Sequence, residues 1–348
     1  MLFATNDDCD IFINGEPHGT VQKAQFTYLK LAPGTYQYKA RSKATLDELS
    51  ESFTVSEGGT NEVFIDLLLV VDEKNAERSR QSTVAVNITS PLVSLKLPDE
   101  FKPTKSDSIN IKKIDTITAA INYFLRNMLL VKEGKFVMGN NRSPFPDESE
   151  HVVTLRPFYF SRFEVTQHQW KILMDYNPSL NKDCDYCPVE NVSWEEVMKF
   201  ISKLNAISGR KFRLPTEAEW EYVAKLGGRE EIESAGGPEE FVKKTAWHFQ
   251  NAANQTHQIG TKEPNVGGVF DMMGNVSEWC SDWYGMSFYR EVIAGKNPRG
   301  PSAGKEKVYR GGNFKDASGD RFRPSLRKKR PPLEKSGDIG FRLVLDID

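Results

Sequence analysis

Cys184 and Cys187 lie in a Cys-Asp-Tyr-Cys segment, the most conspicuous reactive pair in the sequence. Two cysteines with this spacing can form a redox pair, half of a zinc site, or a small disulfide-closed loop. Zinc would need two further soft ligands, and only Cys280 and a histidine could supply them. A redox pair is expected where a strand leads into a helix, whereas here Pro188 follows and the next helix is predicted to begin near Ser193. We therefore favour a structural pair, with thiol chemistry and metal binding as the alternatives.

The general motifs of catalysis are missing from the sequence. It has no glycine-rich phosphate loop, no GxSxG nucleophile turn, no HExxH zinc motif and no EF-hand loop. Two histidines that bind a metal from one helix face would be three or four residues apart, and no pair here has that spacing. We expect surface or hydrogen-bonded structural roles for all five: His18, His151, His168, His248 and His257.

Side chains with hard oxygen donors cluster around a glycine-bearing turn. They are Asn265, Asp271, Asn275 and Glu278. Carboxylate and carbonyl oxygens are the ligands that Ca²⁺ takes in proteins, so this segment is a candidate calcium site. The alternative is that these side chains hydrogen-bond the loop backbone without a metal.

A basic stretch near the C-terminus is the candidate ligand-binding surface. Such a cluster can bind phosphate, an acidic peptide or a nucleic-acid backbone. Its members are Arg321, Arg323, Arg327, Lys328, Lys329 and Arg330. The whole chain has 46 Lys and Arg against 48 Asp and Glu, and this balance does not favour nucleic acid. We expect a protein partner or an anionic ligand, with an ordinary solvated loop as the alternative.

The elements that must position these residues include two helices with clear start signals. Ser193 with Glu196, and Thr216 with Glu219, have the capping-box spacing, in which each side chain accepts a hydrogen bond from the backbone N–H of the other residue. These helices are predicted over 191–209 and 216–228. Most of the remaining chain after residue 131 is expected to form short strands and structured loops.

The length of 348 residues suggests about two domains. Residues 1–71 alternate short strands with turn signals, of which Asn14-Gly15 is the strongest, and predict a small antiparallel β sandwich. Residues 72–130 are charged and contain several prolines, so we read them as a linker. The linker ends in a connecting helix over 114–131, because apolar residues recur there at helical spacing.

The β module resembles the PEGA family of small β domains. The resemblance lies in Asn-Gly-Glu at 14–16, in the segment LAPGTY at 31–36, and in the apolar strand that closes the module. It implies a binding or spacer module without catalytic chemistry.

The chain after residue 131 resembles the formylglycine-generating enzyme family, the sulfatase-modifying-factor type of domain. The resemblance rests on blocks that keep the family's order and spacing: GKFVMGN (134–140), HVVTLRPFYFSRFEVTQHQW (151–170), NPS (177–179), PVENVSWEEV (188–197), GRKFRLPTEAEWEYVAKLGG (209–228), PNVGGVFDMMGNVSEWCSDWYG (264–285), VYRGGNF (308–314) and DIGFRLV (338–344). It implies an α+β domain with a C-type-lectin-like fold over 131–348.

The resemblance also implies a structural calcium site. Family members similar in the GNVSEW block bind calcium there, which makes Asn275 and Glu278 the candidate ligands. Asn251, Asn254 and Asn265 are weaker candidates.

The chain departs from the family's catalytic pattern after Gly311-Gly312. Members that generate formylglycine carry two cysteines, five residues apart, beginning four residues after this pair, and soft thiolates suit their Cu(I). Here the first position is Asp316, and no cysteine occurs in 311–330. No copper is therefore expected. A second branch of enzymes, which makes C–S bonds, uses histidine-bound iron and an HxxxHxE spacing that this chain lacks.

We therefore expect a non-catalytic lectin-like scaffold or binding protein. The alternative is a metal-dependent oxidoreductase with a non-cysteine, iron-type site, for which Asp316, Asp320 and Asp338 are the nearby carboxylates. No apolar run is long enough to span a bilayer, and the first residues lack the features of a secretory signal. We expect a cytoplasmic protein if Met1 is the native start, and a periplasmic or surface protein if an upstream signal was removed.

Overall fold

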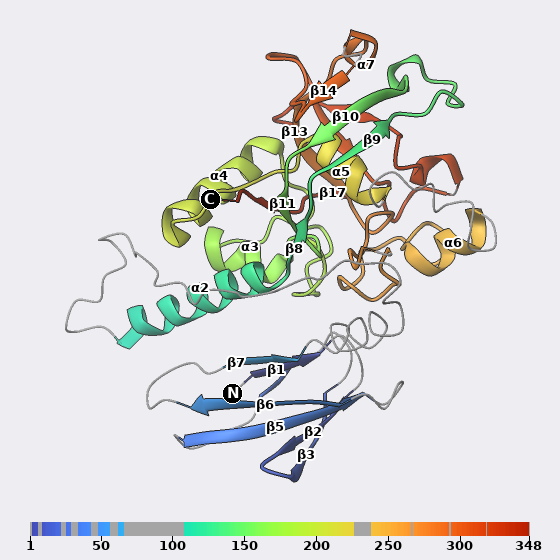
Figure 1. Cartoon of the computed structure of the whole chain (residues 1–348). Coiled ribbons are helices and arrows are strands. Elements are labelled where there is room, and N and C mark those ends of the chain that lie inside the picture. Colours follow the sequence, from blue (N-terminus) through green and yellow to red (C-terminus); the bar gives the residue numbers. More distant parts are fainter. Residues whose placement is uncertain are drawn as a thin grey trace. The chain divides into compact units, whose positions relative to one another are not determined.

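The computed structural model divides the chain into two compact units (Figure 1). The first comprises Met1–Val93 with Asp107–Ala119, and the second Ser94–Ser106 with Ala120–Asp348. The residues that the structure describes are 2–5, 9–21, 26–28, 34–42, 48–55, 62–65, 108–225, 238–265, 267–291, 294–317 and 319–347.

The described part of the first unit is built mainly from β-strands. They are β1 (Leu2–Thr5), β2 (Cys9–Ile13), β3 (Glu16–Val21), β4 (Phe26–Tyr28), β5 (Gly34–Ser42), β6 (Glu48–Val55) and β7 (Glu62–Ile65). They form two sheets with strand orders β4-β1-β7 and β3-β2-β5-β6. The β2–β3 hairpin turns at Asn14 and Gly15, which both have positive φ, as their residue types predict. The described strands fit the predicted β module, but β1 and β7 are parallel, so its strand pairing is not wholly antiparallel. The PEGA resemblance stays a prediction.

The predicted connecting helix is α2 (Ser108–Arg126). Ile117, Ile121 and Phe124 are buried, which confirms its apolar face. The helix ends earlier than predicted, and β8 (Met128–Val131) follows it and pairs with β11 (Phe158–Ser161). β8 is therefore part of a sheet of the second unit, although it lies ahead of the boundary predicted at 131.

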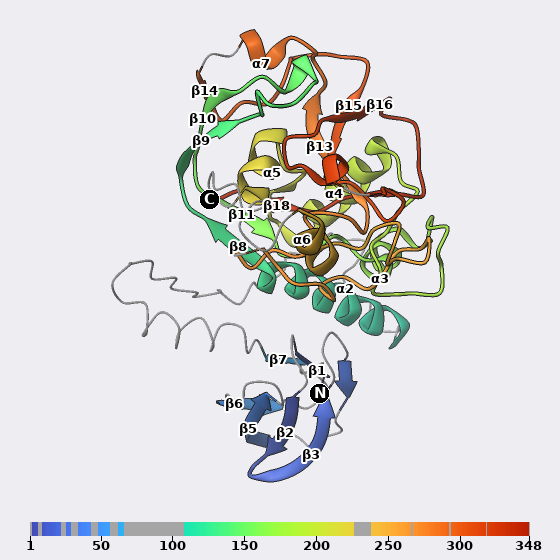
Figure 2. The same ribbon diagram turned by 90° about the vertical axis from the view of Figure 1, so that its right-hand side faces the viewer.

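Three small sheets form the frame of the second unit. Their other strands are β9 (Gly134–Met138), β10 (His151–Leu155), β12 (Phe212–Arg213), β13 (Ser277–Trp283), β14 (Ala294–Lys296), β15 (Lys307–Arg310), β16 (Lys328–Arg330), β17 (Ile339–Gly340) and β18 (Val344–Leu345). The strand orders are β14-β10-β9, β12-β18-β11-β8 and β16-β15-β13-β17. Figure 2 shows β13, β15 and β16 beside one another. This last sheet carries most of the candidate site.

Two helices of the second unit begin where the capping signals predict, and others were not predicted. The described helices after α2 are α3 (Gln167–Met174), α4 (Trp194–Ser208), α5 (Glu217–Ala224), α6 (Pro238–Thr245), α7 (Phe288–Glu291) and the short 3₁₀ turns η2 (Pro146–Glu148) and η4 (Gly319–Phe322). Ser193 and Thr216 form the predicted capping boxes of α4 and α5, and Thr166 forms a third at α3. The end predicted for α5, at 228, lies outside the described residues.

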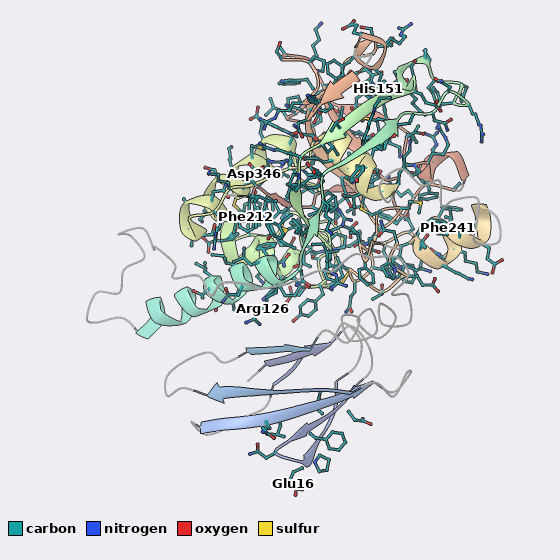
Figure 3. All side chains as sticks on the ribbon, viewed as in Figure 1. Glu16, Arg126, His151, Phe212, Phe241 and Asp346 are labelled. Atoms are coloured by element: carbon teal, nitrogen blue, oxygen red, sulfur yellow. A yellow bond between two sulfur atoms is a disulfide. The ribbon has the colours of Figure 1, made fainter. Side chains whose placement is uncertain are left out.

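Aromatic side chains join the helices to the sheets. Trp170 of α3 stacks on Phe200 of α4 with a centroid distance of 5.2 Å. Phe124 of α2 packs edge-on against Phe200 and also contacts Phe212, which lies among densely packed side chains in Figure 3. Aromatic pairs of this kind add to the free energy of apolar burial. The second unit thus has the predicted mixed α+β construction. Within the described ranges, no helix is long and apolar enough to cross a bilayer.

Candidate functional site

The loop after β15 takes its shape from Gly311 and Gly312. Both have positive φ, 99° and 70°, a conformation that glycine adopts without steric cost. A Cβ on Gly311 would lie 3.0 Å from the Trp220 ring, and one on Gly312 would lie 2.7 Å from the Phe322 ring. The backbone therefore packs directly on two aromatic rings, which places the residues that follow.

Asp316 lies at the end of this loop in an ion pair with Lys328 of β16. Its Oδ2 accepts hydrogen bonds from Lys328 Nζ at 2.7 Å and from the backbone N–H of Asn313 at 3.1 Å. The Asn313 amide donates to Ser277 Oγ, and the Ser277 hydroxyl donates to the Gly312 carbonyl. This network joins the loop to β13 and β16. The carboxylate of Asp316 is thereby neutralised within the protein.

Other carboxylates near this loop do not assemble into a metal centre. The Asp338 carboxylate accepts a hydrogen bond from the Ser336 hydroxyl, and the side chain of Asp320 lies outside the described residues. In the part of the chain that the structure describes, no three His, Cys, Asp or Glu side chains are placed to hold a metal ion. The oxidoreductase alternative therefore gains no support from the positions of Asp316 and Asp338.

In the GNVSEW block, the side-chain amide of Asn275 binds protein groups. Its Oδ1 accepts from His257 N at 3.0 Å, and its Nδ2 donates to Glu164 Oε2 at 2.8 Å and to the His257 carbonyl at 3.1 Å. These contacts match the alternative that Asn275 supports the loop backbone. An ion at Oδ1 would compete with the His257 N–H.

Glu278 forms a buried ion pair with Arg342. Arg342 Nε lies 2.7 Å from Glu278 Oε2 and Nη2 lies 2.6 Å from Oε1, while Trp220 Nε1 also donates to Oε2 at 2.7 Å. Both charged side chains are almost completely excluded from solvent. A bidentate pair of this type is strong and directional. An ion at Glu278 would have to share the carboxylate with Arg342.

One carboxylate oxygen of Asp271 is buried without a hydrogen-bond partner. Its Oδ2 accepts from Gly260 N at 2.7 Å, whereas the buried Oδ1 has no hydrogen-bond partner. Burial raises the pKa of Asp271 to about 6. Burial and the nearby carboxylates of Asp271 and Glu278 also raise the pKa of Glu164 well above its usual value. Arg342 and Lys262 are the cations that act on these acids, so the three carboxyl groups outnumber the positive charges around them.

The weaker calcium candidates support turns. Asn251 Oδ1 accepts from His248 N at 2.8 Å, and Asn265 Oδ1 accepts from the backbone N–H of Gly267 and of Val269. Asn254 is exposed, with a positive φ of 57°. Calcium binding by the predicted set stays a prediction. The orphaned oxygen makes Asp271 the stronger candidate, and its burial could not be read from the sequence.

The prediction of one exposed basic surface is wrong for Arg327, which is buried in an ion pair, and Arg323 is also paired and only 16% exposed. Arg327 bonds Glu217 with both contacts at 2.8 Å, and its side chain is 1% exposed. Arg323 bonds Glu148 at 2.5 Å. A buried guanidinium such as that of Arg327 needs a charged partner, so Arg327 cannot form part of an exposed ligand face.

The remaining members of the basic stretch differ in exposure, and Lys328 is the least exposed of them at 13%. Lys328 forms an ion pair with Asp316. Lys329 pairs with Glu306 at 3.0 Å, and Arg330 pairs with Glu334 at 3.1 Å. Arg321 is exposed on η4. Exposed pairs contribute little and exchange readily with solvent. Arg321 and Lys329 are therefore the members best placed to meet an anionic partner.

Cys184 and Cys187 are joined by a disulfide. This state matches the structural interpretation of the pair, and neither sulfur is then available as a thiolate ligand for zinc. Cys184 is half-buried, whereas Cys187 is 2% exposed.

Comparison with known families decides the relationship of this chain. The Sulfatase-modifying factor enzyme 1-like domain matches residues 116–347. The chain belongs to this family. The match begins inside α2, ahead of the predicted boundary at 131. It covers the whole of the candidate site.

Relatives of the sulfatase-modifying factor family differ in their overall length. The formylglycine-generating enzyme of Streptomyces coelicolor is 34% identical over 174 residues, 46% of this chain and 53% of that protein. Serine/threonine-protein kinase pkn1 of Chlamydia caviae is 27% identical over 326 residues, 86% of this chain and 48% of that protein. The chain thus spans about half the length of these relatives. The pkn1 alignment must extend to residues before 116, because it covers more of the chain than the family domain does.

Solved structures share the family fold. Treponema denticola variable protein 1 has a TM-score of 0.58 and 28% identity, covering 63% of this chain and 95% of its own. PvdO from Pseudomonas aeruginosa has a TM-score of 0.55 over 63% of this chain and 94% of its own, and its 23% identity supports the fold alone. The predicted α+β fold class is confirmed. The cysteine spacing expected from the resemblance, four residues after Gly312 and then five further on, falls on Asp316 and Arg321 in this sequence.

Proposed function

We propose that the sulfatase-modifying factor domain of this chain is a non-catalytic binding domain. The Asp316–Lys328 ion pair carries the proposal, because it stands at the first of the two copper-ligand positions. A carboxylate is a hard ligand, while Cu(I) prefers soft thiolates. The ammonium group at 2.7 Å further repels a cation. Arg321, at the second position, adds another positive charge.

The test measures Cu(I) binding and oxygen-dependent oxidation of a peptide that carries the sulfatase cysteine. We expect neither activity from the wild-type protein. The matched variant combines Asp316→Cys with Arg321→Cys and restores both thiols, so it should bind Cu(I). An Asp316→Ser and Arg321→Ser control removes the same charges without adding thiolates. Peptide oxidation by the wild-type protein would refute the non-catalytic assignment.

We propose an acidic protein surface as the partner of this domain. Within the basic stretch, Arg321 and Lys329 are the most exposed side chains. Lys315, in the loop that contains Asp316, is also exposed. A polyglutamate peptide serves as the probe. Its affinity should fall as salt rises, and Arg321→Glu with Lys329→Glu should abolish it. Arg156→Glu, which removes an exposed cation on another part of the domain, is the control. Equal affinity in both variants would contradict the proposal.

We also propose that calcium stabilises the domain near Asp271. The unpartnered buried Oδ1 supports this assignment, together with the excess of carboxylates over cations described above. Calcium should raise the melting temperature relative to chelator, because an ion that binds only the folded state stabilises it. Asp271→Asn should remove most of this rise, and Asn254→Ala should keep it. An identical melting temperature with calcium and with chelator would contradict the site.

A further inference from the structure

The disulfide ring, residues 184–187, binds the beginning of α3. The Cys187 carbonyl accepts a hydrogen bond from Gln167 N, and the Asp185 carbonyl accepts one from His168 N, both at 2.9 Å. Gln167 and His168 are the first residues of α3, whose N–H groups have no acceptor inside the helix. The ring therefore supplies part of the cap of α3. Changes in the shape of the ring would release these two donors.

The disulfide ring also binds the segment 256–260. The Tyr186 carbonyl accepts from Ile259 N at 3.1 Å, and Cys187 Sγ lies 3.6 Å from the Thr256 carbonyl. The next residue along, Gly260, donates to Asp271 in the buried acid cluster. One small ring thus connects the start of α3 to the loop that borders Asp271.

The two cysteines of the ring differ in their exposure to solvent. Cys184 is half-buried and is flanked by the exposed residues Asp183 and Asp185, whereas Cys187 is 2% exposed. Of the two cysteines, Cys184 is therefore the one that a thiolate from solvent can approach. Thiol–disulfide exchange depends on such access as well as on the thiolate itself.

We propose that the Cys184–Cys187 disulfide is a thiol-exchange site for a dithiol reductant. The reductant's thiolate attacks Cys184 Sγ, the S–S bond breaks, and its electron pair passes to Cys187 Sγ, which takes up a proton. The second thiolate of the reductant then attacks the reductant's own sulfur in the mixed disulfide. The reductant leaves as a cyclic disulfide, and Cys184 Sγ takes up a proton. Two electrons pass to the protein. The new Cys187 thiol can donate to the Thr256 carbonyl, which lies within reach.

Opening the ring removes the constraint that holds its carbonyls against α3 and 256–260. For a closed loop of four residues, the chain-entropy relation corresponds to a factor of about 20 in the local opening equilibrium. Amide hydrogen exchange at Gln167, His168 and Ile259 should therefore accelerate by up to about 20-fold on reduction. The amide of Val197 lies inside α4 and donates to the Ser193 carbonyl, not to the ring. Its exchange should not change.

The experiment treats the native full chain with dithiothreitol, traps free thiols by alkylation and locates them by peptide mass spectrometry. We expect Cys184 and Cys187 to be alkylated without unfolding, and a mixed adduct with a monothiol to form at Cys184. Cys187→Ser should show the faster exchange without reductant and no further response, whereas Cys280→Ser should respond like the wild type. Reduction that occurs only in denaturant, a mixed adduct at Cys187, or unchanged exchange at all three amides would each overturn the proposal.

Discussion

Replacing Asp282 with asparagine should remove a pH-dependent loss of stability. Asp282 lies on β13 and is 3% exposed. Its Oδ2 accepts hydrogen bonds from Glu217 N at 2.9 Å and from Ser281 Oγ at 3.0 Å. Burial, followed by repulsion from Glu217, raises the pKa of Asp282 from 3.8 to about 7. An asparagine side-chain oxygen can accept the same bonds without carrying the charge.

The direction in which stability changes with pH follows from proton binding by Asp282. Between the unfolded pKa near 4 and the folded pKa near 7, the folded protein holds a proton on Asp282 that the unfolded protein has lost. Stability therefore falls as pH rises through this range, and the loss is complete above pH 7. At about 1.4 kcal/mol per pKa unit, the shift corresponds to at most about 4 kcal/mol. Asp282→Asn should match the wild type near pH 4 and exceed it by up to this amount at pH 8.

The assay is urea unfolding at several pH values, followed by tryptophan fluorescence. All six tryptophans lie after residue 169, so the signal reports the family domain and not the β module. Asp183→Asn, which neutralises an exposed acid, is the matched control and should follow the wild-type curve. Parallel stability curves for the wild type and Asp282→Asn between pH 4 and 8 would refute the reasoning.

Two further substitutions test the packing of the candidate site. Arg342→Met should lower the free energy of unfolding by about 3–5 kcal/mol, because it leaves Glu278 buried and unpaired. Adding Glu278→Gln should recover part of this loss in urea unfolding, and an additive double variant would contradict the pairing. Gly312→Ala should cost about 1–3 kcal/mol, because its Cβ would meet the Phe322 ring in a positive-φ conformation. Gly209→Ala, which has open space around its Cβ, is the control for the positive φ alone.

Local signals in the sequence predicted the helices well. Ser193 and Thr216 begin α4 and α5 as expected, because a capping box joins residues only three positions apart. The Asn14-Gly15 turn is equally local. The end of α2 was harder to predict, since residues 128–131 are apolar and fit a helix as well as a strand. Pairing with β11, some thirty residues along the chain, makes them a strand.

Tertiary pairing explains why the basic stretch and the calcium ligands were harder to predict. In the sequence, Arg323 and Arg327 are indistinguishable from the exposed Lys329. Their partners Glu148 and Glu217 lie 175 and 110 positions away, and no local spacing reveals them. The same holds for Glu278, which pairs with Arg342 across 64 positions.

The sequence by itself determined the family, the α+β fold class and the absence of cysteine from residues 311–330, because each of these depends on residue types in a fixed order. Only the tertiary structure decided which charges are buried, which oxygen of Asp271 lacks a partner, and which segments the disulfide ring holds. These properties depend on the water that folding excludes and on contacts between distant segments. The contribution of a charge to stability depends on its burial and its partners, and the order of residues alone does not reveal either.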